Sequence, residues 1–369
     1  MHLEDWQYFI LRPEIKSLPL MEQKRQFLAH QLNYDRMLTE ANAIQQQMQA
    51  QSNASAGGGK KPDTSIIPPP PLVVNFLVVA GGGAAAGSAT AVGGSGAGGL
   101  RTSFGSTSGG ESSAESELTS LSVSTNYTLT VGAGASGTTG VNAGPRGNDS
   151  VFATITSKGG GNGGSGNVDN AGTRETSYPP TDRTKGSGGG AGRNWGTANS
   201  IGIGTTGQGM DGNYSRYDGI YTGGGGGGAS QDGFRGNNGT NPGGGGDGLA
   251  VAITGVSVTY AGGAGGSQAQ GSTATTGGAG GGGNGGVKNG IAPTAGGTNT
   301  GGGGGAPRGA AASPDNASAN GGSGIIILRF PKEYTVTSPG SDHTFSTTTD
   351  GIHKVASFTA GTGNIQFTI

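Results

Sequence analysis

The spacing of apolar residues changes near Gly57, which divides the chain into two parts. Before it, the stretch from Met21 to Gln51 contains neither Gly nor Pro, and good helix formers dominate. Apolar and aromatic residues recur there every seven positions, which predicts an amphipathic helix of three heptads. The two seam positions hold Phe27, Tyr34, Ala41 and Met48, and His30, Met37 and Ile44. This pattern leaves open oligomerisation, docking onto a larger assembly, and a solitary amphipathic helix.

A short apolar arm precedes this helix. Pro13 and Pro19 interrupt it, and it is too short to bury its own apolar side chains. We therefore expect residues 1–56 to anchor the chain on a partner. The expected anchor residues are Trp6, Phe9, Ile10, Leu11, Leu18, Phe27, Tyr34, Met37 and Ile44.

After the helix, residues 57–71 predict a linker that changes from flexible glycine to stiff polyproline. Beyond it, β-branched runs alternate with runs of glycine. The predicted strands lie in Leu72–Ala80, Leu118–Val131, Ser150–Ser157, Leu249–Tyr260 and Gly324–Phe330. The glycine runs between them are Gly223–Gly228, Gly243–Gly246, Gly280–Gly283 and Gly301–Gly305.

The composition restricts what this second part can be. Leu, Ile, Val and Phe together number 58 of 369 residues, which is too few for the core of a conventional globular enzyme. Disorder is the simpler alternative, but it usually accompanies a high net charge, and the formal charge here is −1. Glycine shows no strict period of three, so collagen is excluded. Close backbone packing of extended, three-residue-per-turn glycine helices explains the composition better.

A third pattern follows Phe330. Four short runs predict a small antiparallel meander with Asp350-Gly351 as a hairpin turn: Tyr334–Thr337, His343–Thr348, Ile352–Thr359 and Asn364–Ile369. We expect Phe345, Val355 and Phe358 to share a core with Ile365, Phe367 and Ile369. The predicted fold is thus mostly β and irregular. It consists of an N-terminal α-helical anchor (1–56), a linker (57–71), a polyglycine II-like module with short β-strands (72–330) and a small antiparallel β-meander (331–369).

Four segments of the module resemble a known domain. They are "VVNFLVVAGGGAAAG" (Val73–Gly87), "NYTLTVGAGASG" (Asn126–Gly137), "GPRGNDSVFATITSKGGGNGG" (Gly144–Gly164) and "GGSGIIILRF" (Gly321–Phe330). In this order they are similar to the glycine-rich domain of bacteriophage tail-fibre and receptor-binding proteins, including the T-even-type distal adhesins. The resemblance covers residues 72–330 and implies a virion protein that presents variable loops to the host surface. The helical N-terminal arm is not part of the resemblance.

No pattern of catalytic or metal-binding chemistry stands out. Matches to GxGxxG are expected by chance in a chain with 84 glycines, and cysteine is absent. No metal-ligand spacing occurs among His2, His30, His343 and His353. Three acidic residues in a Ser-rich loop favour a solvated loop over a catalytic pair: Glu111, Glu115 and Glu117. We expect no enzyme, no cofactor, no metal, no nucleic-acid binding and no membrane insertion.

The unusual local signal is aromatic. Rings stand among glycine, Asn, Arg and Asp, where flat faces and planar polar groups suit recognition of sugars or exposed protein loops. The alternative is that the rings fill gaps between glycine helices. The candidate receptor-binding residues are Arg193, Trp195, Tyr214, Arg216, Tyr217, Tyr221, Phe234 and Arg235.

Together these features predict a tail fibre or receptor-binding appendage, made in the host cytoplasm and carried on the virion. We expect the N-terminal segment to bind other virion proteins and the chain to form a homo-oligomer. The partner on the host is then a surface glycan or an outer-membrane protein. The competing class is a purely architectural virion component, such as a capsid fibre, decoration or connector protein.

Overall fold

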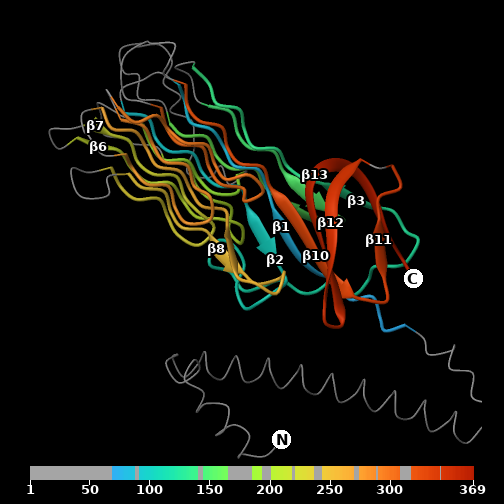
Figure 1. Cartoon of the computed structure of the whole chain (residues 1–369). Coiled ribbons are helices and arrows are strands. Elements are labelled where there is room, and N and C mark those ends of the chain that lie inside the picture. Colours follow the sequence, from blue (N-terminus) through green and yellow to red (C-terminus); the bar gives the residue numbers. More distant parts are fainter. Residues whose placement is uncertain are drawn as a thin grey trace, which may run out of the picture. The chain divides into compact units, whose positions relative to one another are not determined.

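The computed structural model describes residues 69–369 except 88–90, 140–143, 165–184, 193–200, 218–220, 237–242, 270–273, 288–289, 308–316 and 341. Within these residues the chain is mostly β, as the sequence predicts, with thirteen strands and no helix (Figure 1). A search of the same residues found no helix long and apolar enough to cross a membrane. The predicted N-terminal helix, and with it every predicted anchor residue, lies outside the described residues.

Nine strands form one sheet, in which every pair of neighbours is antiparallel. Its path is β2 (Leu100–Thr102), β1 (Asn75–Val79), β10 (Ile325–Pro331), β13 (His353–Thr368), β3 (Tyr127–Thr130), β4 (Ser150–Phe152) and β5 (Ile155–Ser157). Two further strands, β11 (Thr335–Thr337) and β12 (His343–Asp350), also pair with β13. The predicted C-terminal meander is therefore continuous with the sheet that contains β1 and β10.

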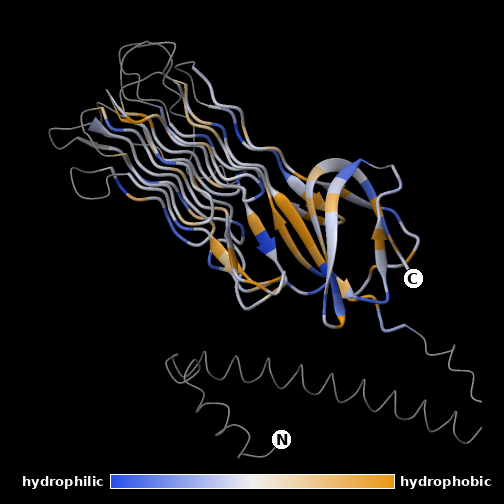
Figure 2. Ribbon diagram, viewed as in Figure 1, coloured by the Kyte–Doolittle hydropathy of each residue, from blue (hydrophilic) through white to orange (hydrophobic). Residues whose placement is uncertain are grey.

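The central strands β1 and β10 are buried on both faces, which explains their uninterrupted apolar sequences. Alternate residues enter two cores, because successive side chains of a strand point to opposite faces. The aromatic core contains Phe76, Val78, Leu129, Phe152, Ile326, Leu328, Phe330, Phe358, Ile365 and Phe367. The junction core contains Leu77, Val79, Leu100, Val251, Ile253, Tyr260, Ile325, Ile327 and Val355, together with small residues of the glycine-rich part. Figure 2 shows apolar residues concentrated in these strands.

The last strand differs from its prediction. A single 16-residue strand, β13, replaces the two predicted runs. Val355 enters the junction core rather than joining Phe358, because residues three apart in a strand face opposite sides. A register shift against β12 and the positive φ of Gly361, 114°, interrupt the alternation, so Ile365 still reaches the aromatic core. Ile369 is 74% exposed and shares no core.

Three predicted strands proved shorter than their apolar runs. Ser150–Ser157 folds back as the β4–β5 hairpin, with Ala153 at a φ of 50° in its turn. Leu249–Tyr260 likewise forms β8 (Leu249–Val251) and β9 (Val258–Tyr260). Only Tyr127–Thr130 of the run Leu118–Val131 is a strand. Strands of three or four residues carry too little periodicity to be separated from their turns by sequence.

The glycine-rich segments pack into an array that we call the glycine lattice. Along residues 223–229, successive backbone N–H groups donate to three neighbouring segments in turn, and the fourth returns to the first. The acceptors, in order, are the carbonyl oxygens of Ser267, Ala191, Phe234, Ala264, Gly188, Gln231 and Ala261. This three-residue repeat satisfies the backbone without side chains, in three directions at once.

Close approach explains why the lattice requires glycine. A Cβ atom built on Gly225 or Gly302 would lie less than 3.0 Å from the backbone of a neighbouring segment. The same holds for most glycines of the lattice. Polar side chains form hydrogen bonds with backbone N–H and C=O groups that the three-residue repeat leaves unpaired. Inside, Ser95 Oγ lies 2.9 Å from Gly83 O and 2.7 Å from Gly304 O. At the sides, carboxylates accept backbone N–H bonds: Asp149 from Gly159, Asp211 from Gly204 and Asp247 from Ala279.

Candidate recognition surface

The glycine lattice has two ends. One joins the nine-stranded sheet, and the other carries the hairpin of β6 (Arg216–Tyr217) and β7 (Tyr221–Thr222), as Figure 1 shows. We call the second the distal end. It is tied to the lattice through bridges from Thr222 to Gln268 and from Gln268 to Val287. The hairpin is therefore built on ordered backbone.

The distal end brings several candidate residues onto adjoining segments. In the hairpin, Tyr217 is paired with Tyr221. The Gly236 N–H donates to the Tyr214 carbonyl oxygen at 2.8 Å, which places residues 233–236 beside residues 213–217. Six of the eight predicted residues thus come from three neighbouring segments: Tyr214, Arg216, Tyr217, Tyr221, Phe234 and Arg235. Arg193 and Trp195 lie outside the described residues.

Two rings of this group are exposed on a fixed backbone. Tyr214 is 42% exposed and Phe234 is 40% exposed. Phe234 nevertheless donates its N–H to Gly244 O at 2.8 Å, and its carbonyl oxygen accepts the Gly225 N–H at 2.9 Å. Arg235 is also exposed, and Tyr221 is half-buried. The lattice therefore presents aromatic surface whose backbone is already ordered, which lowers the entropy cost of binding.

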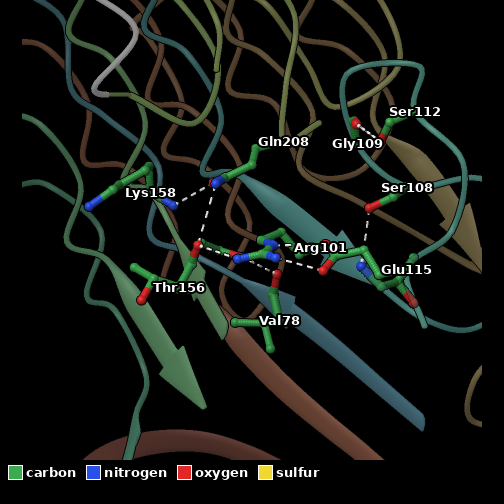
Figure 3. A network of polar contacts seen from close by, with 11 residues as sticks. Val78, Arg101, Ser108, Gly109, Ser112, Glu115, Thr156, Lys158 and Gln208 are labelled. Carbon is green, nitrogen blue, oxygen red and sulfur yellow. Dashed lines mark hydrogen bonds and ion pairs between the residues drawn. The ribbon is translucent and has the colours of Figure 1, made fainter. Parts of the chain in front are cut away.

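The acidic group of the Ser-rich loop is structural rather than simply solvated. Glu115 forms a bidentate ion pair with Arg101: Arg101 Nε donates to Glu115 Oε1 at 2.7 Å, and Nη2 donates to Oε2 at 2.6 Å (Figure 3). Glu117 accepts a hydrogen bond from Asn75, whereas Glu111 is exposed. Glu115 and Glu117 therefore each have a side-chain partner within the fold.

The same network joins the sheet to the lattice, and no sequence pattern predicted it. Gln208 Oε1 accepts the Lys158 N–H at 2.8 Å, and Gln208 Nε2 donates to Thr156 O at 3.4 Å (Figure 3). Arg101 Nη1 donates to the same Thr156 oxygen at 3.3 Å. These residues are far apart in the sequence and belong to no recognisable motif.

The two described histidines are likewise held by the protein. His343 Nδ1 lies 2.8 Å from Ser338 Oγ, and its Nε2 lies 2.9 Å from Leu129 O. His353 Nδ1 lies 3.3 Å from Arg329 Nη2. Burial, followed by the charge of Arg329, lowers the pKa of His353. No group of three or more possible metal ligands occurs in the part of the chain that the structure describes.

Comparison with known proteins identifies the module. Neither the comparison with curated proteins nor that with solved structures found a match. The family model described as a glycine-rich domain matches residues 55–331. This range covers the lattice and ends at the last residue of β10, and it leaves β11, β12 and β13 outside. Because the match extends over most of the sequence, the chain belongs to the glycine-rich domain family.

Proposed function

We propose that this chain is a structural protein of a bacteriophage particle and recognises the host cell surface through its distal end. The observation that carries the proposal is the pair of exposed rings, Tyr214 and Phe234, on hydrogen-bonded lattice backbone. Exposed aromatic and Arg side chains on a rigid scaffold are typical binding anchors. The resemblance of the sequence to tail-fibre and receptor-binding proteins supplies the biological setting.

Pro70 lies at the sheet, because Tyr334 Oη donates to its carbonyl oxygen at 2.6 Å. The hairpin β6–β7 lies at the other end of the lattice (Figure 1). In the proposal, the preceding residues 1–56 bind other virion proteins, and the distal end meets a surface glycan or an outer-membrane protein.

We also infer that the lattice is a bundle of polyglycine II helices. A helix with three residues per turn sends successive N–H groups in three directions, and residues 223–229 follow that pattern. Such a bundle is stiff, which suits an appendage that must hold its tip away from the particle. Backbone angles near φ −75° and ψ +145° along residues 223–229, measured in a crystal structure, test this inference.

Loss of attachment tests the recognition role. We expect Tyr214→Ala or Phe234→Ala to weaken binding of purified protein to host cells about tenfold, or about 1.4 kcal/mol, without a change in thermal unfolding. Trp195→Ala and Tyr217→Ala are expected to act in the same way. Ile352→Ala serves as the control, because Ile352 is 69% exposed but lies at the sheet.

A purely architectural role makes the opposite prediction. If the purified protein never binds host cells, and particles with Ala at all eight candidate positions adsorb normally, the architectural class replaces ours. A deletion of residues 1–56 tests the anchor separately. The truncated chain is expected to fold and to be absent from purified particles, and its incorporation at normal levels would remove the anchor hypothesis.

A further inference from the structure

The two exposed rings of the distal end lie on neighbouring segments of the glycine lattice. Tyr214 belongs to residues 209–215, which we call the tyrosine row, and Phe234 belongs to residues 231–236, which we call the phenylalanine row. Every third residue of each row is buried: Gly209, Gly212 and Ser215 in the first, and Gly233 and Gly236 in the second. The residues between them are at least partly exposed, so the backbone of each row determines where its ring is placed.

The two rows run parallel, and backbone hydrogen bonds join them at every third residue. The Gly233 N–H donates to Asp211 O at 3.0 Å, and the Gly236 N–H donates to Tyr214 O at 2.8 Å. Three residues of an extended three-per-turn chain span about 9 Å, which leaves a long gap between these two bonds. The peptide groups that precede Tyr214 and Phe234 both lie within this gap.

The side chain of Asn213 bridges the gap. Its Nδ2 donates to Gly233 O at 2.8 Å, and its Oδ1 accepts the Tyr214 N–H at 2.8 Å. Only this orientation of the carboxamide satisfies both partners, because a flipped amide would place oxygen against oxygen and N–H against N–H. The main chain of Asn213 is also fixed, since its N–H donates to Gly225 O and its carbonyl oxygen accepts the Ala191 N–H, both at 2.9 Å.

Asn213 reaches Phe234 through a single peptide group. The Gly233 carbonyl belongs to the peptide group whose N–H is that of Phe234, and this N–H donates to Gly244 O at 2.8 Å. The peptide group is thus held at its oxygen by Asn213 and at its nitrogen by Gly244. Because a peptide group is planar, these two contacts fix its orientation and the direction in which the Phe234 side chain leaves the row.

We propose that Asn213 is a positioning residue of the distal recognition surface, which holds Phe234 in the direction in which it meets the ligand. This role rests on the recognition function proposed above. Asn213 is half-buried and both ends of its carboxamide are engaged within the protein, so its contribution to binding is made through Phe234. An Asp at this position keeps an acceptor for the Tyr214 N–H but sets a carboxylate oxygen against Gly233 O.

A double-mutant cycle with Phe234 tests this role. We expect Asn213→Asp to weaken binding of the purified full chain to host cells about tenfold, and to change the binding of Phe234→Ala protein less than about twofold. The matched control is Asn284→Asp, because Asn284 is exposed on the lattice and its side chain accepts the Gly277 N–H, a bond that Asp preserves. The control should bind like the wild type. Equal weakening by Asn213→Asp in both backgrounds indicates a general disturbance of the fold and overturns the proposal.

Hydrogen exchange gives a second readout that does not depend on a ligand. The Phe234 amide should exchange about tenfold faster in Asn213→Asp than in the wild type, because its peptide group is released at the oxygen. Asn284→Asp should leave this exchange unchanged. Unchanged exchange in Asn213→Asp overturns the proposal. If exchange is faster but the wild type binds no host cells, host recognition is overturned, whereas the positioning of Phe234 by Asn213 is confirmed.

Discussion

The sheet and the glycine lattice exclude water by different means. In the sheet, large side chains fill the interior, and five phenylalanines are fully buried: Phe76, Phe152, Phe330, Phe358 and Phe367. In the lattice, the interior is largely backbone, and neighbouring segments approach too closely for a Cβ atom. One small cluster of buried apolar side chains in the lattice consists of Ala85, Ala86, Val92 and Ala306.

Because their interiors differ, the sheet and the lattice are destabilised by opposite kinds of substitution. In the sheet, removing atoms leaves a cavity and loses buried apolar contacts. In the lattice, adding atoms separates two backbones that exchange hydrogen bonds. A chain with few large apolar residues can still be ordered, because part of its interior depends on hydrogen bonds and close backbone contact instead of side-chain volume.

The largest effect is expected when the lattice is overpacked. Gly225→Val and Gly302→Val each place a side chain against neighbouring backbone, at about 3 kcal/mol or more apiece. Together they approach the roughly 5–15 kcal/mol that stabilises a whole domain. We expect the double variant to lose its cooperative thermal unfolding transition.

A matched glycine is available as the control. A Cβ atom on Gly290 meets nothing within 4 Å, and Gly290 is exposed. Gly290→Val should therefore unfold at nearly the wild-type temperature. Equal behaviour of the control and the double variant would mean that the glycine runs are not close-packed.

In the sheet, truncation of a large buried side chain is expected to lower the free energy of unfolding. Phe358 is fully buried and stacks on Phe345, with ring centroids 4.7 Å apart. Phe358→Ala should cost about 3–5 kcal/mol, because the site cannot collapse around the missing ring. Denaturant unfolding measures this cost, and Phe345→Ala is the control, since Phe345 is only partly buried. A loss below about 1 kcal/mol would show that the aromatic core is not well packed.

The sequence predicted the sheet strands more accurately than their arrangement. The apolar runs that became β1 and β10 were visible because both faces of these strands are buried. Nothing in the sequence showed that β13 would pair with β10, β3, β11 and β12, since strand pairing over such distances leaves no local pattern. The ordered lattice was predicted from glycine content and low net charge, but its three-residue hydrogen-bond repeat depends on which segments become neighbours.

The recognition role of the candidate surface stays a prediction, and the structure bears only on the exposure of its residues. Rings among glycines drew attention to Tyr214 and Phe234, and the structure leaves both exposed. Their segments lie side by side because the Gly236 N–H donates to Tyr214 O, and this pairing across the β6–β7 hairpin and residues 223–229 leaves no local pattern in the sequence.

The smallest effect concerns pH and should be confined to the sheet. Burial, followed by the charge of Arg329, lowers the pKa of His353, and the carboxylates of Asp350, Glu117 and Glu333 only oppose this. The folded protein therefore favours the neutral imidazole, whereas the unfolded chain binds a proton as pH falls through about 6.5. Stability should be greatest above that value and decline below it, because the unfolded state then binds more protons. His353→Gln should reduce the fall in unfolding temperature between about pH 7.5 and about pH 5.5. His343→Gln, which keeps His353, should retain it. If both variants show the same decline in unfolding temperature, another group is responsible for it. If low pH increases hydrogen exchange in the lattice alone, the effect does not originate in the sheet.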